Sequence, residues 1–223
     1  MDKRFWAILG ALLIVVVGAI WISNDKKGNN NNTNVAPTNH VEGQGTTGVK
    51  LVEYGDYECP ICGMYYPTVK QVQAEFNSKI FFQFRNLPLT SIHQNAMAGA
   101  RAAEAASLQN KFWQMHDLLY ENQNSWADAS DPTTYFTDYA KQLGLNVTKF
   151  QSDEASDYVN NLINADLNAF NQTGQQEATP TFFLDGKYIS NSKLVDSSGQ
   201  PSATKFAAII NSEIAAKEKT SSK

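Results

Sequence analysis

The chain has 223 residues, of which 42% are hydrophobic and 11% aromatic, enough apolar side chain for a sizeable core or two small subdomains. Its formal net charge of −4 and the lack of any Lys and Arg cluster argue against nucleic-acid binding by bulk electrostatics. The sequence contains two cysteines, Cys59 and Cys62, so its cysteine chemistry depends on that one pair.

An apolar stretch without a charge, FWAILGALLIVVVGAIWI, occupies residues 5–22. As a helix, its 18 residues would span about 27 Å, close to the hydrocarbon thickness of a bilayer. Trp6 and Trp21 lie near its two ends, where interfacial aromatic residues belong. A cleaved signal peptide is the alternative, but its apolar region is usually shorter, and Ile20–Ser23 makes a poor cleavage site. We therefore expect residues 1–22 to be an uncleaved membrane anchor.

Residues 23–48 form a low-complexity segment rich in Asn, with Thr, Pro and Gly. Because this segment has no apolar period, we expect a flexible tether. Residues 218–223 are polar, and we expect this tail to fray.

A strand, a helix and a second strand are expected next. Residues 49–54 are predicted to form a buried strand, and residues 62–76 a helix with a kink at Pro67. The aromatic run at residues 80–84, IFFQF, predicts the second strand. Together they form one βαβ unit.

The following residues, 90–175, are expected to be helical, and strands return after them. Apolar spacing and Ala content predict helices over 94–108, 112–120, 132–143 and 159–170. A hairpin with a two-residue turn at Asp185-Gly186 and a last helix containing Phe206 and Ile214 complete the chain. This order predicts a mixed α/β sheet domain formed by residues 49–89 and 176–217, with a helical domain inserted at 90–175.

The cysteine pair lies at the junction between the first strand and its helix, in the sequence Cys59-Pro60-Ile61-Cys62. Unpaired backbone N–H groups and the helix dipole favour a thiolate at the first cysteine, and the thiolate is the form that attacks disulfides. This position predicts a redox-active disulfide in which Cys59 is the exposed nucleophile and Cys62 the shielded resolving thiol.

Other uses of the pair fit less well. A zinc site needs about four ligands, and His40, His93 and His116 lack ligand spacing to the cysteines. A copper site would lack nearby ligands apart from Met64. A purely structural disulfide over so short a loop would restrict the unfolded chain little. We expect neither a metal nor a cofactor.

Four segments, the first of which contains the cysteine pair, occur in a characteristic order: EYGDYECPIC at 53–62, NLPL at 86–89, KFWQMHDLL at 111–119 and ATPTF at 178–182. Together they resemble the DsbA-like thiol–disulfide oxidoreductases of the thioredoxin superfamily, especially the membrane-anchored bacterial type. The resemblance covers about residues 49–215. It implies a thioredoxin fold with an inserted helical domain, here preceded by an N-terminal transmembrane helix.

The resemblance also implies functions for particular residues. The family carries an acid at the position of Glu53, buried under the disulfide, which moves protons to or from Cys62; the alternative is a Glu53 that faces solvent at a strand edge. Pro180 would be a cis-proline beside the active site, and the Thr179 backbone would hydrogen-bond an extended substrate.

Pro60 fits the first helical turn, where its missing N–H costs nothing. Ile61 occupies a position where strongly oxidising relatives often carry His, and Ile cannot donate a hydrogen bond. Glu58 next to Cys59 would also disfavour the thiolate, so we expect a weaker oxidant than a His-bearing relative.

Three polar residues near these motifs are given structural interpretations. We expect His93 to be a cap or loop contact, His116 a buried core histidine, and Asp56 a turn former.

The expected function is an extracytoplasmic thiol–disulfide oxidoreductase that introduces disulfides into exported proteins with reduced cysteines. The charges flanking the apolar stretch are nearly balanced, but disulfide chemistry favours the extracytoplasmic side for the catalytic domain of a single-pass membrane protein. The resemblance alone implies a membrane partner of the DsbB or VKOR type that reoxidises the pair. A reductase or isomerase kept reduced by a membrane electron donor, and a non-enzymatic chaperone or redox sensor, stay open as alternatives.

Overall fold

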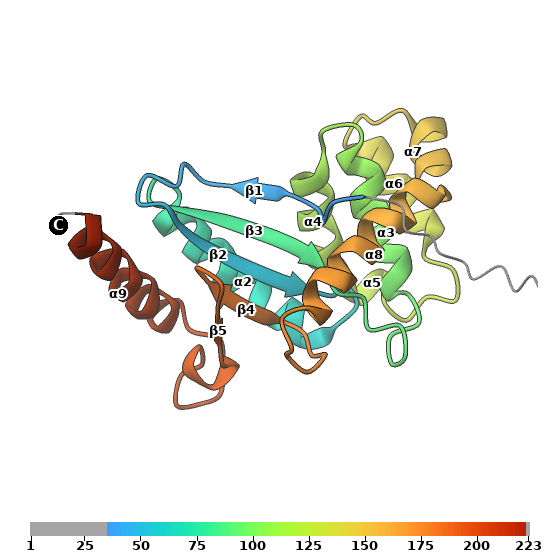
Figure 1. Cartoon of the computed structure of the whole chain (residues 1–223). Coiled ribbons are helices and arrows are strands. Elements are labelled where there is room, and N and C mark those ends of the chain that lie inside the picture. Colours follow the sequence, from blue (N-terminus) through green and yellow to red (C-terminus); the bar gives the residue numbers. More distant parts are fainter. Residues whose placement is uncertain (1–34, 222–223) are drawn as a thin grey trace, which may run out of the picture. The chain divides into compact units, whose positions relative to one another are not determined.

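The computed structural model describes residues 35–221 of the chain (Figure 1). The expected anchor at residues 1–22 and the first part of the expected tether lie outside these residues. Within residues 35–221, no helix has both the length and the apolar character needed to cross a membrane.

A mixed sheet of five strands forms the centre of the described part of the chain, in the order β1-β3-β2-β4-β5 (Figure 1). β2 and β3 are parallel and joined by α2, whereas β1, β4 and β5 each pair antiparallel with their neighbours. The strands are β1 (His40–Glu42), β2 (Val49–Gly55), β3 (Ile80–Asn86), β4 (Thr181–Leu184) and β5 (Lys187–Ile189).

The alternation of side chains along β2 divides the sheet into two faces. Val49 and Leu51 are fully buried in the main core with residues of α2 (Pro60–Phe76). α9 (Ala203–Ser221) lies on the same face, since Phe206 contacts both Tyr65 of α2 and Phe182 of β4. Lys50, Val52 and Tyr54 therefore point to the opposite face of the sheet.

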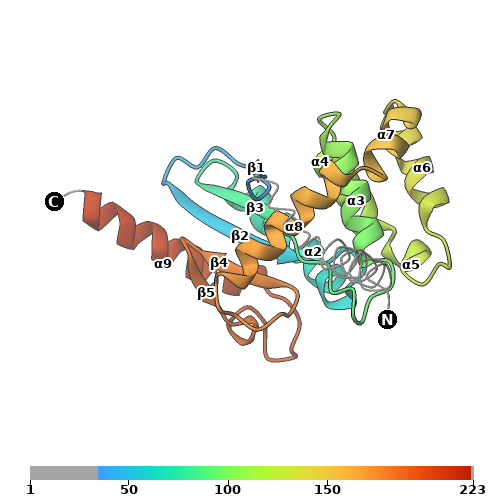
Figure 2. The same ribbon diagram turned by 45° about the vertical axis from the view of Figure 1, so that its right-hand side comes forward.

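The helices between β3 and β4 gather at the end of the sheet where β2 and β3 finish (Figure 2). They are α3 (Ala96–Ser107), α4 (Phe112–Glu121), α5 (Gln123–Trp126), α6 (Thr133–Gln142), α7 (Val147–Glu154) and α8 (Asp157–Asn171). α5 and α7 were not predicted, because α5 is very short and α7 buries only Phe150. α7 instead depends on its cap, in which the Asn146 side chain accepts a hydrogen bond from the backbone N–H of Lys149 at 2.9 Å.

The expected tether over residues 23–48 is wrong for its described C-terminal part. Residues His40–Glu42 form β1, which pairs with β3. The buried Thr38 donates its backbone N–H and its hydroxyl to the Asp166 carboxylate at 2.8 and 2.6 Å. His40 lies 2.9 Å from a carboxylate oxygen of Glu104. These partners are far away in the sequence, so local composition gave no sign of them.

The ends of several predicted elements also shift. α2 begins at Pro60, two residues before the predicted start, because proline fits the first helical position. α9 continues to Ser221 and so includes most of the tail expected to fray. The expected limits of the inserted helical domain fall in the connections from β3 to α3 and from α8 to β4.

Candidate active site

Cys59 caps the N-terminus of α2 with an extended backbone, and Cys62 lies one turn further along the helix. Both cysteines are free thiols. Cys62 is fully buried, as predicted, but Cys59 is only 5% exposed, so its expected exposure is wrong. The reason is the loop before β4, where the Thr179 carbonyl oxygen lies 3.5 Å from the Cys59 sulfur.

The two thiols have opposite acidities. The pKa of Cys59 is lowered to about 6, first because the Cys62 thiol donates a hydrogen bond to its thiolate, and this outweighs the opposing effect of burial. Hydrogen bonds from the backbone at Cys62 and Ile61 lower it further. Burial raises the pKa of Cys62 well above its usual value, and the Cys59 hydrogen bond and charge add to this. Cys59 is therefore the thiolate and Cys62 the protonated partner near neutral pH.

Glu53 is an acid in the middle of β2, between β3 and β4, and is 3% exposed. It points to the same sheet face as Leu51, which is the face covered by α2. Burial raises its pKa to about 8, and the negative charge of Cys59 contributes in the same direction. A solvent-facing Glu53 at a strand edge is thus wrong. The carboxyl group is protonated at neutral pH and close enough to act on both thiols electrostatically.

The peptide bond between Thr179 and Pro180 is cis, as the resemblance implied. Asn191 donates a side-chain hydrogen bond to the Pro180 carbonyl at 2.8 Å, and the Thr181 hydroxyl donates to the Ala178 carbonyl at 2.6 Å. The Thr179 hydroxyl is buried and has no partner among residues 35–221. These contacts hold the loop against Cys59.

Asp56 fixes the loop between β2 and Cys59. Its carboxylate accepts the Glu58 backbone N–H at 2.9 Å, which makes the turn predicted from the sequence. It also accepts the Leu89 N–H at 3.0 Å and lies 2.6 Å from His93 Nδ1. The interpretations of Asp56 as a turn former and His93 as a loop contact are confirmed.

Glu58 was expected to act against the Cys59 thiolate, but its carboxylate is engaged elsewhere. It accepts the backbone N–H of Asn95 at 2.5 Å, at the N-terminus of α3. A negative charge is favoured there by the helix dipole. Burial nevertheless raises the pKa of Glu58.

Gln123 was missed by sequence reasoning. Its side-chain amide donates to the carbonyl oxygens of Tyr57 and Cys59 at 2.7 and 2.9 Å, and thereby connects α5 to the active-site loop. Gly63 makes room for it, since a Cβ at that position would overlap the Gln123 side-chain oxygen. An isolated glutamine in a polar stretch carries no signal for this contact.

His116 is a core histidine, as predicted. It is 2% exposed, its Nδ1 lies 3.1 Å from Asp117, and aromatic rings including Tyr57 and Phe84 surround it. Within the described part of the chain, no group of three His, Cys, Asp or Glu side chains is arranged to hold a metal ion.

Solved structures with this fold include thiol–disulfide oxidoreductases. BdbD from Bacillus subtilis in its oxidised form is 21% identical with a TM-score of 0.66, over 81% of this chain and 97% of that one. Alpha-DsbA1 from Wolbachia pipientis is 18% identical with a TM-score of 0.63, over 85% and 98%. MdbA from Corynebacterium diphtheriae is 20% identical with a TM-score of 0.56, over 75% and 95%. At these identities the likeness shows the fold.

Among curated proteins, the chain is 36% identical over 148 residues to a Na(+)/H(+) antiporter NhaA of Salinispora tropica, covering 66% of this chain. A second NhaA antiporter, from Salinispora arenicola, is 37% identical over 148 residues. The chain spans only 22% of the length of each. The model of the family described as thioredoxin matches residues 35–200, more than half of the chain. The chain, with its cysteine pair at the start of α2 and its cis-proline beside it, therefore belongs to the thioredoxin family.

Proposed function

We propose that this chain is a protein thiol–disulfide oxidoreductase of the DsbA type, which introduces disulfides into exported proteins through Cys59 and Cys62. The observation that carries the proposal is the opposite acidity of the two thiols. The pKa of Cys59 is lowered to about 6 and that of Cys62 is raised. A stable Cys59 thiolate favours the reduced pair. The Cys59–Cys62 disulfide is therefore a good oxidant of substrate thiols.

The size of this effect follows from the Cys59 pKa alone. At pH 7, a thiol with a pKa of about 6 instead of 9 stabilises the reduced form by about 1.4 kcal/mol, or about 30 mV for a two-electron couple. Stabilisation of the reduced form raises the reduction potential of the Cys59–Cys62 pair.

The reaction begins when a substrate thiolate attacks the Cys59 sulfur of the Cys59–Cys62 disulfide. The bond between the two cysteines breaks, and Cys62 leaves with the electron pair and takes up a proton. Glu53, protonated at neutral pH and buried on this face of β2, is the group placed to supply it. A second substrate thiolate then attacks the substrate sulfur of the mixed disulfide, and Cys59 leaves as a thiolate. The substrate gains a disulfide and loses two electrons, which the cysteine pair holds.

The two electrons must pass to an oxidant before the next cycle. We assign this step to a membrane partner of the DsbB or VKOR type. The proposed site of action is the extracytoplasmic side of the cell membrane, with residues 1–22 as a single-pass anchor. Support comes from the uncharged apolar stretch at residues 5–22 and from the cysteine chemistry, which belongs outside the cytosol.

The reduction potential of the cysteine pair tests the proposal. The full chain is equilibrated with glutathione buffers of known ratio, and the fraction reduced is measured by thiol alkylation, with Cys62→Ser as the control that cannot form the internal disulfide. We expect a potential near or above that of the glutathione couple. A potential as low as that of thioredoxin, about −270 mV, would contradict an oxidase and favour a reductase kept reduced by an electron donor.

A further inference from the structure

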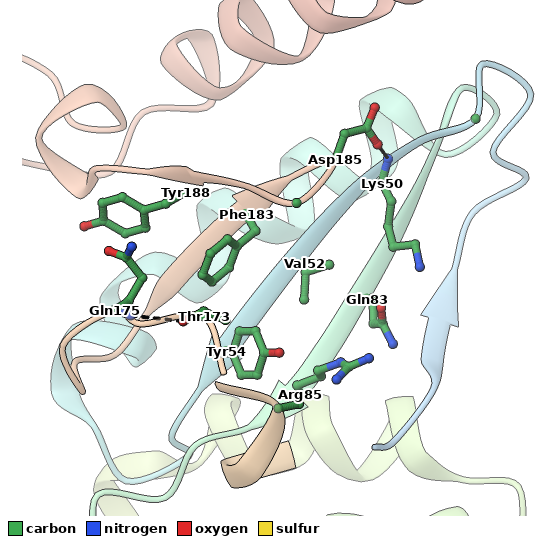
Figure 3. Close-up of a pocket in the computed structure, with 13 residues that line it drawn as sticks. Lys50, Val52, Tyr54, Gln83, Arg85, Thr173, Gln175, Phe183, Asp185 and Tyr188 are labelled. Atoms are coloured by element: carbon green, nitrogen blue, oxygen red, sulfur yellow. Dashed lines mark hydrogen bonds between the residues drawn. The ribbon is translucent and has the colours of Figure 1, made fainter. Parts of the chain in front are cut away.

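A cleft of about 560 Å³ lies on the sheet face opposite α2, away from the cysteine pair. Its volume falls within the range of small-molecule sites, about 300–1,000 Å³. The register places Gln83 of β3, Val52 of β2, Phe183 of β4 and Tyr188 of β5 in one row across four strands. Figure 3 shows these side chains on one face of the sheet. The cleft is therefore built on regular, paired strands.

Aromatic rings line one side of the cleft (Figure 3). The Tyr54 and Phe183 rings meet edge to face at 5.8 Å, and those of Phe183 and Tyr188 at 6.0 Å. α8 closes this end, because Phe170 packs on Tyr54 at 5.2 Å. Tyr188 is 49% exposed, so the row of rings continues from the interior to the surface. Such a row suits a flat apolar ligand.

Two cationic side chains occupy the other side of the cleft. Lys50 and Arg85 flank Gln83, and within residues 35–221 neither forms an ion pair with a carboxylate. Arg85 lies over the Tyr54 ring, 5.9 Å from its centroid. Figure 3 shows the Lys50 ammonium pointing to the Gln83 side.

Among the described residues that line the cleft, Asp185 is the one carboxylate, and it does not neutralise these cations. Asp185 accepts the backbone N–H of Lys50 at 2.8 Å with one oxygen, and its other oxygen pairs with Lys217 at 2.7 Å. A ligand in the cleft thus meets positive charge next to an aromatic wall.

We propose that this cleft binds a flat organic anion, an aromatic or conjugated carboxylate or sulfonate. Its anionic group lies between Arg85 and Lys50, and its apolar body lies on Tyr54, Phe183 and Tyr188. Because side chains alternate along β2, the ligand would be separated from Glu53 and the thiols by the sheet itself. Binding and disulfide exchange are therefore measurable independently of each other.

The test uses the full chain and three probes of one shape: 2-naphthoate, neutral 2-naphthol and cationic 2-naphthylmethylamine. Calorimetry gives each affinity, and amide NMR shifts locate each probe. We expect 2-naphthoate to bind at least tenfold more tightly than the other two probes. It should shift the amide NMR signals of Val52, Phe183 and Tyr188. Lys50→Gln and Arg85→Gln, singly and together, should remove this preference.

Lys187→Gln is the matched control, since Lys187 lies on β5 beside Tyr188 but pairs with Glu213 of α9 on the other face. This variant should bind 2-naphthoate like the unchanged chain. An unchanged thermal midpoint and an unchanged Cys59 alkylation rate would show that each variant is folded. If the Arg85→Gln variant does not fold, Lys50→Gln alone tests the preference for the anion. Equal affinity for 2-naphthoate and 2-naphthol, an unchanged preference in a folded Lys50→Gln variant, or shifts centred on Cys59 would each overturn the proposal.

Discussion

The low pKa of Cys59 depends first on a hydrogen bond from its own partner, the Cys62 thiol. Serine at position 62 retains a donor, whereas alanine does not. We predict that alkylation of Cys59 by iodoacetamide rises with a midpoint near pH 6 in the unchanged chain and close to it in Cys62→Ser. In Cys62→Ala the midpoint should move up toward that of an ordinary thiol. Equal midpoints in the two variants would mean that the backbone at Cys62 and Ile61 sets the acidity without the Cys62 side chain.

Glu53 should make the stability of the reduced chain depend on pH. A carboxyl group whose pKa is raised from 4.5 to about 8 on folding keeps a proton that the unfolded chain releases. Stability is therefore lost as the pH rises through that interval. We predict that Glu53→Gln, which cannot ionise, gains stability over the unchanged chain by roughly 3 kcal/mol between pH 5 and pH 8.

Urea unfolding of the reduced chain at several pH values measures this gain. Glu75→Gln is the control, because Glu75 is an exposed acid on α2. The difference in unfolding free energy between Glu75→Gln and the unchanged chain should not grow as the pH rises. A constant difference between Glu53→Gln and the unchanged chain would mean that Glu53 is already ionised in the folded protein at pH 5.

At the level of single residues, the sequence predicted which residues carry the chemistry. It did not predict the burial and the contacts of those residues. The spacing of Cys59 and Cys62 at a strand-to-helix junction defined the redox pair, and an acid in an apolar strand pointed to Glu53. The burial of Cys59 was not predictable, because Thr179 covers it from 120 positions away along the chain. Gln123 was missed for the same reason, since its partners are backbone carbonyls that any sequence supplies.

At the level of elements, the short helix α5 is connected to the start of α2 through Gln123. We predict that Gly63→Ala displaces this side chain and destabilises the protein by about 1–3 kcal/mol, since the Tyr57 carbonyl loses the Gln123 donor and the Cys59 carbonyl keeps only the backbone N–H of residue 63. Gln123→Ala should cost a similar amount. The double variant should cost clearly less than the sum, because the added methyl group then finds space.

Urea unfolding of the four proteins gives the coupling energy directly. Additive losses would show that Gly63 is needed for α2 itself rather than for the contact with α5.

Elements with strong local patterns were predicted, and those that depend on distant partners were not. β2, β3 and α2 carry continuous apolar or aromatic spacing, and all three formed where expected. β1 has three residues and lies next to a low-complexity segment, so nothing local indicates a strand. It forms because β3 offers a free edge and because Asp166 and Glu104 bind the residues around it.

For the molecule as a whole, the redox state and the folding stability are linked in a cycle. The cysteine pair of the unfolded chain has ordinary thiols, whereas folding lowers the pKa of Cys59 to about 6. Because the folded protein stabilises the Cys59 thiolate, reduction of the cysteine pair is more favourable in the folded chain than in the unfolded chain. The reduced protein should then be more stable toward unfolding than the oxidised one, contrary to the usual effect of a disulfide.

We predict that the reduced chain is more stable than the oxidised chain by about 1 kcal/mol or more at pH 7. Because the Cys59 pKa is depressed on folding, this advantage should shrink as the pH falls through 6 and the thiolate is protonated. Urea unfolding with and without reductant measures both effects, and a Cys59→Ser/Cys62→Ser variant should unfold at the same urea concentration with and without reductant at every pH in this interval. If the oxidised chain were the more stable one, the disulfide would be held rather than donated, and the proposed direction of electron flow would be reversed.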